Sequence, residues 1–215
     1  MVLSFYRRQL AKPYVKRYMA WTDIFVLEPA SAIVTEWVSP LSWLSPNSIT
    51  CISFLINSIA VYFYTLGGTA NWVIGAVIWQ LGYVLDGVDG KLARKRGITS
   101  PFGAKLDVTL DKAKKVMCLA AIWWSSPEAH QLWLGLIYVG HYGLQIWRVA
   151  KSSALYDAIH RHRVREVFEP LDVQNFMILL GPLTGQPLLF AALASIGLII
   201  DRMAHLTYRG TVSNR

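Results

Sequence analysis

Long apolar segments, separated by short polar connections, occupy most of the chain between residues 49 and 208. Six can be distinguished, at roughly residues 49–66, 71–94, 103–124, 129–149, 173–183 and 187–208. A membrane-spanning helix needs about 20 largely apolar residues. The third segment is apolar only in its second half, and the fifth is short and contains Gly181 and Pro182. The pattern nevertheless predicts an all-α integral membrane protein with six transmembrane helices.

The composition supports a membrane protein rather than an ordinary soluble domain. Hydrophobic residues make up 54% of the 215 positions, against about 45–50% in typical soluble domains. Nine Trp and ten Tyr suit the aromatic belts found at membrane surfaces. The net charge of +8 is not arranged as a soluble basic module, whereas the anionic cytoplasmic leaflet attracts such charge. We therefore expect the partner to be a lipid bilayer and not a nucleic acid.

The positions of Lys and Arg predict the orientation of the chain in the membrane. The connections LGGTAN (66–71), SSPEAHQ (125–131) and TGQP (184–187) contain no Lys or Arg. Every Lys and Arg falls on the other side of the expected membrane or in the adjoining helix halves. Because basic residues favour the cytoplasmic side, we expect a multi-pass protein of the cell membrane with both termini in the cytoplasm.

The segment before the first span contains apolar residues at roughly helical spacing. They are Ile24, Val26, Leu27, Ile33, Val34 and Val38. With Trp37 and Trp43 close to the expected interface, they predict an amphipathic helix on the cytoplasmic membrane surface. The alternative is a helix packed on the protein. We expect an N-terminal interfacial segment over residues 1–44, a membrane domain over 45–209 and a tail over 210–215.

Four aspartates stand at the cytoplasmic ends of the second and third segments. Asp86 and Asp89 are three residues apart, and Asp107 and Asp111 are four apart, so each pair lies on one helix face. The loop between the segments contains glycine and proline, which allows the two helices to turn back antiparallel. The two pairs are then expected to face each other across one cleft. Carboxylates so placed repel one another unless a cation joins them, and hard oxygen ligands select Mg²⁺, Mn²⁺ or Ca²⁺.

Small residues and one arginine accompany the carboxylates. Gly87, Gly90, Ala93 and Gly103 leave the helix surfaces bare, so that a bulky ligand can approach the backbone. Arg94 follows Gly90 by four residues and shares its helix face, where a guanidinium suits phosphate. A two-metal site with an arginine is suited to phosphoryl transfer from a nucleotide.

The pattern D-x-x-D-G-x-x-A-R-(x8)-G-x-x-x-D-x-x-x-D resembles the signature of the CDP-alcohol phosphotransferase (CDP-alcohol phosphatidyltransferase) family. All its fixed positions are matched, by Asp86, Asp89, Gly90, Ala93, Arg94, Gly103, Asp107 and Asp111. At average residue usage such a match arises by chance on the order of once in 10⁸ chains of this length. The stretch SPNSIT (45–50) is also similar to the T-P-N-x-x-T that opens the first membrane helix in this family.

The resemblance implies a role for each matched residue. Asp86, Asp89, Asp107 and Asp111 would bind two Mg²⁺ (or Mn²⁺) ions that hold the pyrophosphate of a CDP-linked donor. The donor pocket would be formed by Pro46, Asn47, Thr50, Gly90, Ala93, Arg94, Ser100 and Gly103. Asp111 would also act as the general base that deprotonates the acceptor hydroxyl, and CMP would leave. The family also implies a homodimer.

Basic residues beyond the motif indicate an anionic acceptor, such as a phosphorylated polyol. The candidates are Lys112, Arg148, Lys151 and Arg202. Asp201 and Arg202 could alternatively form contacts unrelated to the acceptor. Lys114 and Lys115, which follow the last aspartate, are expected to extend to the membrane surface.

The expected function is transfer of a phosphatidyl group from a CDP-linked donor, CDP-diacylglycerol, to a phosphate-bearing alcohol in phospholipid biosynthesis. Two likenesses within the family disagree on the substrate. The pair Asp111–Lys112 resembles bacterial phosphatidylglycerophosphate synthases, whereas residues 28–50 resemble members that use inositol phosphates with a CDP-polyol donor. A donor such as CDP-inositol therefore stays open. The alternatives of another class are a membrane cation carrier and a catalytically silent scaffold.

Overall fold

The computed structural model describes residues 27–146 and 176–207. Every regular element in these ranges is a helix, which confirms the predicted all-α class. The elements are α2 (Glu28–Val38), α3 (Pro46–Leu66), α4 (Thr69–Arg96), α5 (Pro101–Ser125), α6 (Glu128–Ile146), the π-helix η3 (Phe176–Leu180), α9 (Gly181–Thr184) and α10 (Pro187–Thr207).

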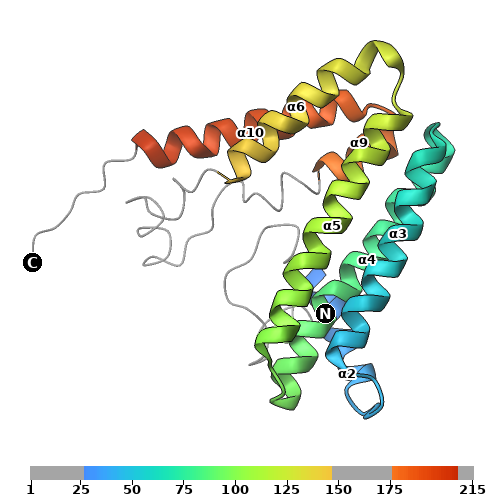
Figure 1. The fold of residues 1–215 in the computed structure, drawn as a ribbon, viewed down its shortest axis with the longest axis vertical. Helices are drawn as coiled ribbons and strands as arrows, with labels where there is room; N and C mark the ends of the chain where they lie inside the picture. Colours follow the sequence, from blue (N-terminus) through green and yellow to red (C-terminus); the bar gives the residue numbers. More distant parts are fainter. Residues whose placement is uncertain (1–26, 147–175, 208–215) are drawn as a thin grey trace, which may run out of the picture.

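Helices α3, α4 and α5 run side by side in alternating directions, and this bundle carries the motif residues (Figure 1). The turn between α3 and α4 uses Gly67 and Gly68, whose φ angles are 70° and 76°. Helix α4 ends at Gly97 with φ 68°. These positive φ angles favour glycine. Both chain reversals therefore depend on residues that allow a positive φ angle. As a result, α3 and α5 begin at the same end of the bundle.

Helices α6 and α10 lie against each other and extend to one side from the far end of this bundle (Figure 1). The main hydrophobic core lies where they meet it. Its buried side chains come from α3 to α6, η3 and α10, and include Trp72, Trp79, Ile122, Leu134 and Leu198. The hydroxyl of Tyr64 donates to the carbonyl of Ile178 at 3.0 Å. The core is therefore assembled at the opposite end of α4 from the aspartates.

Glycines on α4 allow α3 to approach closely. A methyl group at Gly75 would lie 3.0 Å from the ring of Tyr64, and one at Gly82 would lie 2.3 Å from Asn57 Oδ1. Asn57 is fully buried, and neither polar atom of its side chain has a hydrogen-bond partner among the described residues. Close helix approach over small residues is typical of membrane helix packing.

The predicted spans correspond to helices with some differences. Within the described residues, two helices are both long and apolar enough to cross a membrane, over Pro46–Leu66 and Pro187–Ala204. Helices α4 and α5 have 28 and 25 residues but carry the charged motif. The fifth segment is not one regular helix, since it changes from π-helix to α-helix at Gly181 and Pro182. The count of six spans stays a prediction.

The predicted N-terminal helix is present as α2, and it packs against α4. The buried face of α2 includes the small residues Ser31, Ala32 and Thr35. Trp37 and Trp43 are 73% and 76% exposed. Contact of α2 with the protein is thus established, whereas its attachment to a membrane surface stays a prediction. The part of the expected helix before residue 27 lies outside the described residues.

One arginine fastens the α2–α3 connection to the end of α4. Nη1 of Arg96 donates to the carbonyl of Leu44 at 2.6 Å. Nη2 donates to the carbonyls of Val38, Ser39 and Leu41 at 3.2, 3.0 and 2.8 Å. A planar guanidinium presents several donors in a fixed arrangement and so can bind a set of carbonyls in this way.

Two lysines of the same basic run also contact the protein. Lys95 pairs with Glu36. Lys91 Nζ lies 2.7 Å from Glu28 Oε2, and both side chains are buried. The basic residues near the end of α4 therefore attach α2 to the bundle, in addition to any attraction to lipid that their charge predicts.

We expect Arg96→Ala to lower the Tm of the detergent-solubilised protein by about 5 °C, which corresponds to about 2 kcal/mol for a chain of this size. The reason is the loss of a charged donor that joins four carbonyls. Arg96→Lys should restore less than half of the loss, because one ammonium cannot reproduce the planar fork. Lys105→Ala, at an exposed site on α5, is the control. Equal Tm values for Arg96→Ala and this control would contradict the role of Arg96.

Candidate active site

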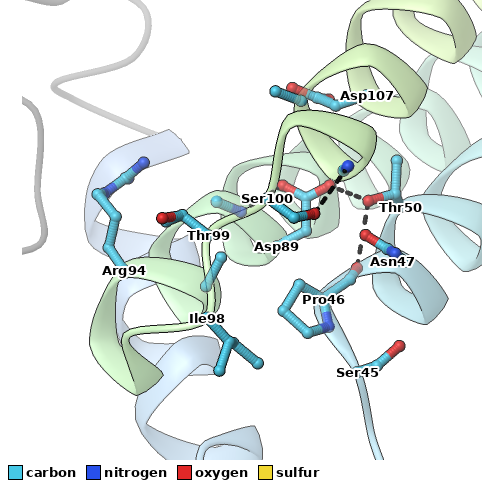
Figure 2. Close-up of a pocket in the computed structure, with 14 residues that line it drawn as sticks. Ser45, Pro46, Asn47, Thr50, Asp89, Arg94, Ile98, Thr99, Ser100 and Asp107 are labelled. Atoms are coloured by element: carbon cyan, nitrogen blue, oxygen red, sulfur yellow. Dashed lines mark hydrogen bonds between the residues drawn. The ribbon is translucent and has the colours of Figure 1, made fainter.

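A pocket of about 350 Å³ opens where the first turns of α3 and α5 meet the last turns of α4 (Figure 2). It is lined by Ser45, Pro46, Asn47, Thr50, Asp89, Gly90, Ala93, Arg94, Ile98, Thr99, Ser100, Gly103, Ala104 and Asp107. Figure 2 shows Arg94 on the side of the pocket opposite Asn47 and Thr50, with Asp89 between them. The pocket therefore combines acidic side chains, a guanidinium and two helix starts.

Both helix starts are capped by serine. The Ser45 side chain accepts from the N–H of Ser48 at 3.0 Å, and the Ser100 side chain accepts from the N–H of Gly103 at 3.0 Å. Proline follows each cap, a position at which its fixed φ suits the first helical turn. The first turn of a helix carries partial positive charge and unpaired N–H groups. Two such turns at one pocket favour an anionic ligand.

Glycines keep the pocket open. Above Gly90, the Nη1 atom of Arg94 lies 3.2 Å from where a Cβ would stand, and at Gly103 a Cβ would lie 2.9 Å from Asn47 Oδ1. Side chains at these positions would displace Arg94 or Asn47. The sequence inference that bare helix surfaces admit a bulky ligand is consistent with this geometry at Gly90 and Gly103. Gly87 does not line the pocket, since a Cβ there would lie 3.1 Å from Ser31 Oγ on α2.

Asp89 is the buried carboxylate of the pocket. The hydroxyl of Thr50 donates to its Oδ2 atom and also lies 3.2 Å from the carbonyl of Pro46 (Figure 2). This contact joins the first turn of α3 to the motif on α4 and sets the orientation of the carboxylate. Groups that orient a ligating carboxylate commonly change metal affinity or activity 10- to 100-fold when they are removed.

Asp86 and Asp111 are held by lysines instead of lining the pocket. Lys114 Nζ lies 2.6 Å from Asp86 Oδ1 and 3.2 Å from Asp111 Oδ1. Lys115 Nζ lies 2.6 Å from Asp111 Oδ2. The hydroxyl of Ser53 is 3.3 Å from Asp86 Oδ1 and 3.0 Å from the carbonyl of Gly82.

The expectation that Lys114 and Lys115 extend to the membrane surface is therefore wrong. Lys114 is only 2% exposed. Both lysines lie one helical turn after Asp111. A partly buried carboxylate is stabilised by an opposite charge at that spacing, so the two ammonium groups turn inward.

The donor set fits a hard divalent cation, since aspartate oxygens are the ligands that Mg²⁺ and Mn²⁺ prefer. Asp89 and Asp107 face the pocket, and Asp86 and Asp111 lie beside them on the same two helices. Among the described residues, no three carboxylate, His or Cys groups converge closely enough to form a metal cluster. Lys114 supplies positive charge between Asp86 and Asp111 in this arrangement.

The structure places the predicted donor-binding residues and the predicted metal ligands differently. The eight donor-binding candidates all line the pocket: Pro46, Asn47, Thr50, Gly90, Ala93, Arg94, Ser100 and Gly103. Of the four predicted metal ligands, Asp89 and Asp107 line it and Asp86 and Asp111 do not. Sequence reasoning missed Ser45, Ile98, Thr99 and Ala104. The serine–proline start of α3 was a usable signal for Ser45, whereas nothing in the sequence distinguished the others.

The two acceptor-binding candidates that the structure describes, Lys112 and Arg202, are not brought together. Lys112 is exposed on α5, and Arg148 and Lys151 lie outside the described residues. Arg202 is 3% exposed, and its Nη1 lies 2.9 Å from Asp201 Oδ2. In Figure 1 the C-terminal half of α10, which carries this pair, extends away from α4 and α5. Their role in acceptor binding stays a prediction.

The family model described as CDP-alcohol phosphatidyltransferase matches residues 43–203. The chain belongs to the CDP-alcohol phosphatidyltransferase family. This confirms the resemblance inferred from the eight motif positions. Members of this family are transferases of substituted phosphate groups and generally use divalent metal ions. The match covers the pocket and every aspartate of the motif.

Curated relatives share parts of the chain. An archaetidylinositol phosphate synthase of Pyrococcus horikoshii is 38% identical over 79 residues, which is 37% of this chain and 40% of the relative. A bifunctional IPC transferase and DIPP synthase of Aquifex aeolicus is 27% identical over 84% of this chain and 44% of its own length. An inner membrane protein of Escherichia coli is 33% identical over 45% and 47% of the two chains. The matches thus span less than half of each of these relatives.

Thr50→Val should lower donor kcat/KM by 10- to 100-fold, because it removes the hydroxyl that orients Asp89. Thr50→Ser keeps that hydroxyl and should stay within about threefold of the wild type. Ser58→Ala is the matched control, since among the described residues the Ser58 hydroxyl bonds the carbonyl of Phe54 on its own helix. The three variants would be compared by CMP release at varied donor concentration. Wild-type kinetics in Thr50→Val would contradict the role given to this contact.

Proposed function

We propose that this chain transfers a phosphatidyl group from a CDP-linked donor, CDP-diacylglycerol, to the hydroxyl of a phosphate-bearing alcohol and releases CMP. The observation that carries the proposal is the pocket, which gathers all eight donor-binding candidates with Asp89 and Asp107. A reaction of this kind belongs to phospholipid biosynthesis. The proposal places the pocket at the cytoplasmic face of a cell membrane that the chain crosses several times.

The pocket can bind a nucleoside diphosphate through its charged and polar walls. The first turns of α3 and α5 direct N–H groups toward an anion, and the guanidinium of Arg94 can bind phosphate oxygens. The bare surfaces at Gly90 and Gly103 admit the nucleoside. An apolar lipid tail attached to the far phosphate would extend into the bilayer, which is why CDP-diacylglycerol is the preferred donor.

Asp111 is the proposed general base. Its carboxylate takes the proton from the acceptor hydroxyl while the oxygen attacks the phosphorus distal to cytidine. The bond from that phosphorus to the bridging oxygen breaks, and CMP leaves with both electrons. Arg94 stabilises the charge that develops on the leaving phosphate.

We propose that Asp86, Asp89, Asp107 and Asp111 hold two Mg²⁺ or Mn²⁺ ions. When bound, these ions supply charge neutralisation for the pyrophosphate. Thr50 keeps Asp89 oriented toward the pocket. A homodimer is the assembly that the family implies, and it belongs to the proposal in the same way.

The acceptor is proposed to be an anionic alcohol, with inositol phosphate the first to be tested. Support comes from the name of the Pyrococcus relative, an archaetidylinositol phosphate synthase, and from the basic residues after the motif. A separate observation supports testing a soluble donor such as CDP-inositol, since residues 28–50 resemble family members that use CDP-polyol donors.

CMP release by purified protein is the deciding measurement. With CDP-diacylglycerol and Mg²⁺, we expect CMP only when an acceptor is present, from a panel of inositol phosphate, glycerol 3-phosphate and serine. Asp111→Asn should lower the rate by 10²- to 10⁴-fold, the usual contribution of a general base. Glu36→Gln, which removes a carboxylate from a surface pair with Lys95, should not change it.

The outcomes separate the alternatives. CMP from CDP-inositol but not from CDP-diacylglycerol would replace the proposed donor and keep the chemistry. No CMP from either donor, with cation movement across vesicles, would support a carrier. Tight CDP binding without turnover would support a silent scaffold.

Two substitutions test the acceptor site. We expect Lys112→Met and Arg148→Ala each to raise the acceptor KM about tenfold while the donor KM stays constant, because each removes a charged contact to phosphate. Arg202→Ala should instead lower Tm as much as Asp201→Asn does, since the two residues form a buried pair. A rise in acceptor KM for Arg202→Ala alone would assign it to the acceptor. Unchanged KM values in all variants would contradict an anionic acceptor.

A further inference from the structure

Ser53 is a fully buried serine on α3 that belongs to none of the motif's fixed positions. Its hydroxyl lies 3.3 Å from Asp86 Oδ1 and 3.0 Å from the carbonyl of Gly82, both on α4. Ser53 follows Thr50 by three residues, and Asp86 precedes Asp89 by three. The contact by which the Thr50 hydroxyl binds Asp89 is therefore repeated about one helical turn further along α3.

The register of the two helices keeps Ser53 opposite Asp86. Asn57 follows Ser53 by four residues, and it faces Gly82, which precedes Asp86 by four. A Cβ at Gly82 would lie 2.3 Å from Asn57 Oδ1, so α3 and α4 approach closely at this point. Close packing of two helices over a small residue limits their movement along each other. The Ser53 hydroxyl therefore has a fixed place beside Asp86.

Ser53 and Lys114 contact the same oxygen of Asp86. Lys114 Nζ lies 2.6 Å from Oδ1, the atom that the Ser53 hydroxyl also approaches. Within the described part of the chain, Oδ2 of Asp86 makes no hydrogen bond or ion pair, and it is not fully buried. Each oxygen of an ionised carboxylate can accept separately. The two contacts on Oδ1 thus leave Oδ2 as the oxygen that can bind a ligand.

The lysine by itself does not fix the orientation of this carboxylate. Lys114 Nζ is shared with Asp111 Oδ1 at 3.2 Å, and it ends a flexible four-carbon chain. The Ser53 hydroxyl is attached directly to Cβ, on a helix that packs closely against α4. Contacts from two different helices, α3 and α5, limit rotation of the Asp86 carboxylate more than the ammonium alone can.

We propose that Ser53 is a positioning residue that, together with Lys114, holds Asp86 through Oδ1, so that Oδ2 is presented to a divalent cation. This inference rests on the proposed function, in which Asp86 is one of the metal ligands. Removal of a group that orients a ligating carboxylate commonly changes metal affinity 10- to 100-fold. Ser53 thereby does for Asp86 what Thr50 does for Asp89, from the same face of α3.

The test is Mn²⁺ binding by the full chain in detergent, without donor, measured by titration calorimetry and by the EPR signal of free Mn²⁺. Asp86→Asn identifies the binding step that depends on this carboxylate, and Ser53→Ala should weaken the same step at least tenfold. The Tm without metal should fall by less than about 3 °C. The reason is that Asp86 keeps its contact with Lys114, and the Gly82 carbonyl stays within α4.

Three further variants separate the hydroxyl from the space that it fills. Ser53→Cys has a similar size but only a weak donor, so it should bind Mn²⁺ as Ser53→Ala does. Ser53→Thr keeps the hydroxyl and should stay within about threefold of wild type. Ser58→Ala removes a hydroxyl that bonds the Phe54 carbonyl on the same helix and should not change Mn²⁺ binding. If the extra methyl of Thr prevents folding, the contrast between Ser53→Cys and wild type decides.

The outcomes distinguish this inference from the function on which it rests. Weakened Mn²⁺ binding in Ser53→Ala and Ser53→Cys, with CMP release requiring correspondingly more Mn²⁺, would support the positioning role. Wild-type binding in Ser53→Cys would assign Ser53 to packing and overturn that role, while metal-dependent CMP release would stand. Wild-type binding in Ser53→Ala, or in Asp86→Asn, would overturn it as well. Absence of Mn²⁺ binding in wild type would overturn both the inference and a metal-dependent transfer.

Discussion

Carboxylates that lie between packed helices require a positive charge or a hydrogen-bond donor in contact with them, and the end of this bundle that carries the motif is arranged around that requirement. Asp86 and Asp111 meet it through Lys114, which joins α4 to α5. The carboxylate of Asp89 accepts a hydrogen bond from the Thr50 hydroxyl, and this contact joins α4 to α3. An unpaired charge in such surroundings would be strongly destabilising. The contacts that neutralise or hydrogen-bond the motif carboxylates are therefore also contacts that hold the three helices together.

The pocket depends equally on how the helix ends are fastened. Arg96 binds the carbonyl of Leu44, the residue directly before the Ser45 cap of α3. Glu28 and Lys91 form a buried pair that attaches α2 to α4. The main core lies at the other end of the bundle, so these polar contacts, together with the smaller buried cluster of Ile49, Val88 and Leu92, set the positions of the residues around the ligand site.

Much of this arrangement could be predicted from the sequence because the relevant signals are local. The length of the apolar segments predicted the helices, and glycine and proline predicted their ends. The spacing of Asp, Gly and Arg predicted the pocket, although Asp86 and Asp111 lie outside its lining. The inward turn of Lys114 was not predictable, since a lysine near a helix end usually extends to the surface and only the tertiary contact with Asp86 reverses this. The break at Gly181 and Pro182 was visible, but not the π-helix before it.

Gly82 and Asn57 illustrate a further property of the α3–α4 contact. The amide of Asn57 lies where any side chain at position 82 would stand, and that amide is buried. A larger residue at 82 is therefore compatible with the fold only if position 57 becomes smaller. The two positions, 25 apart along the chain, are therefore expected to change together during evolution, because the two helices approach each other closely at this point.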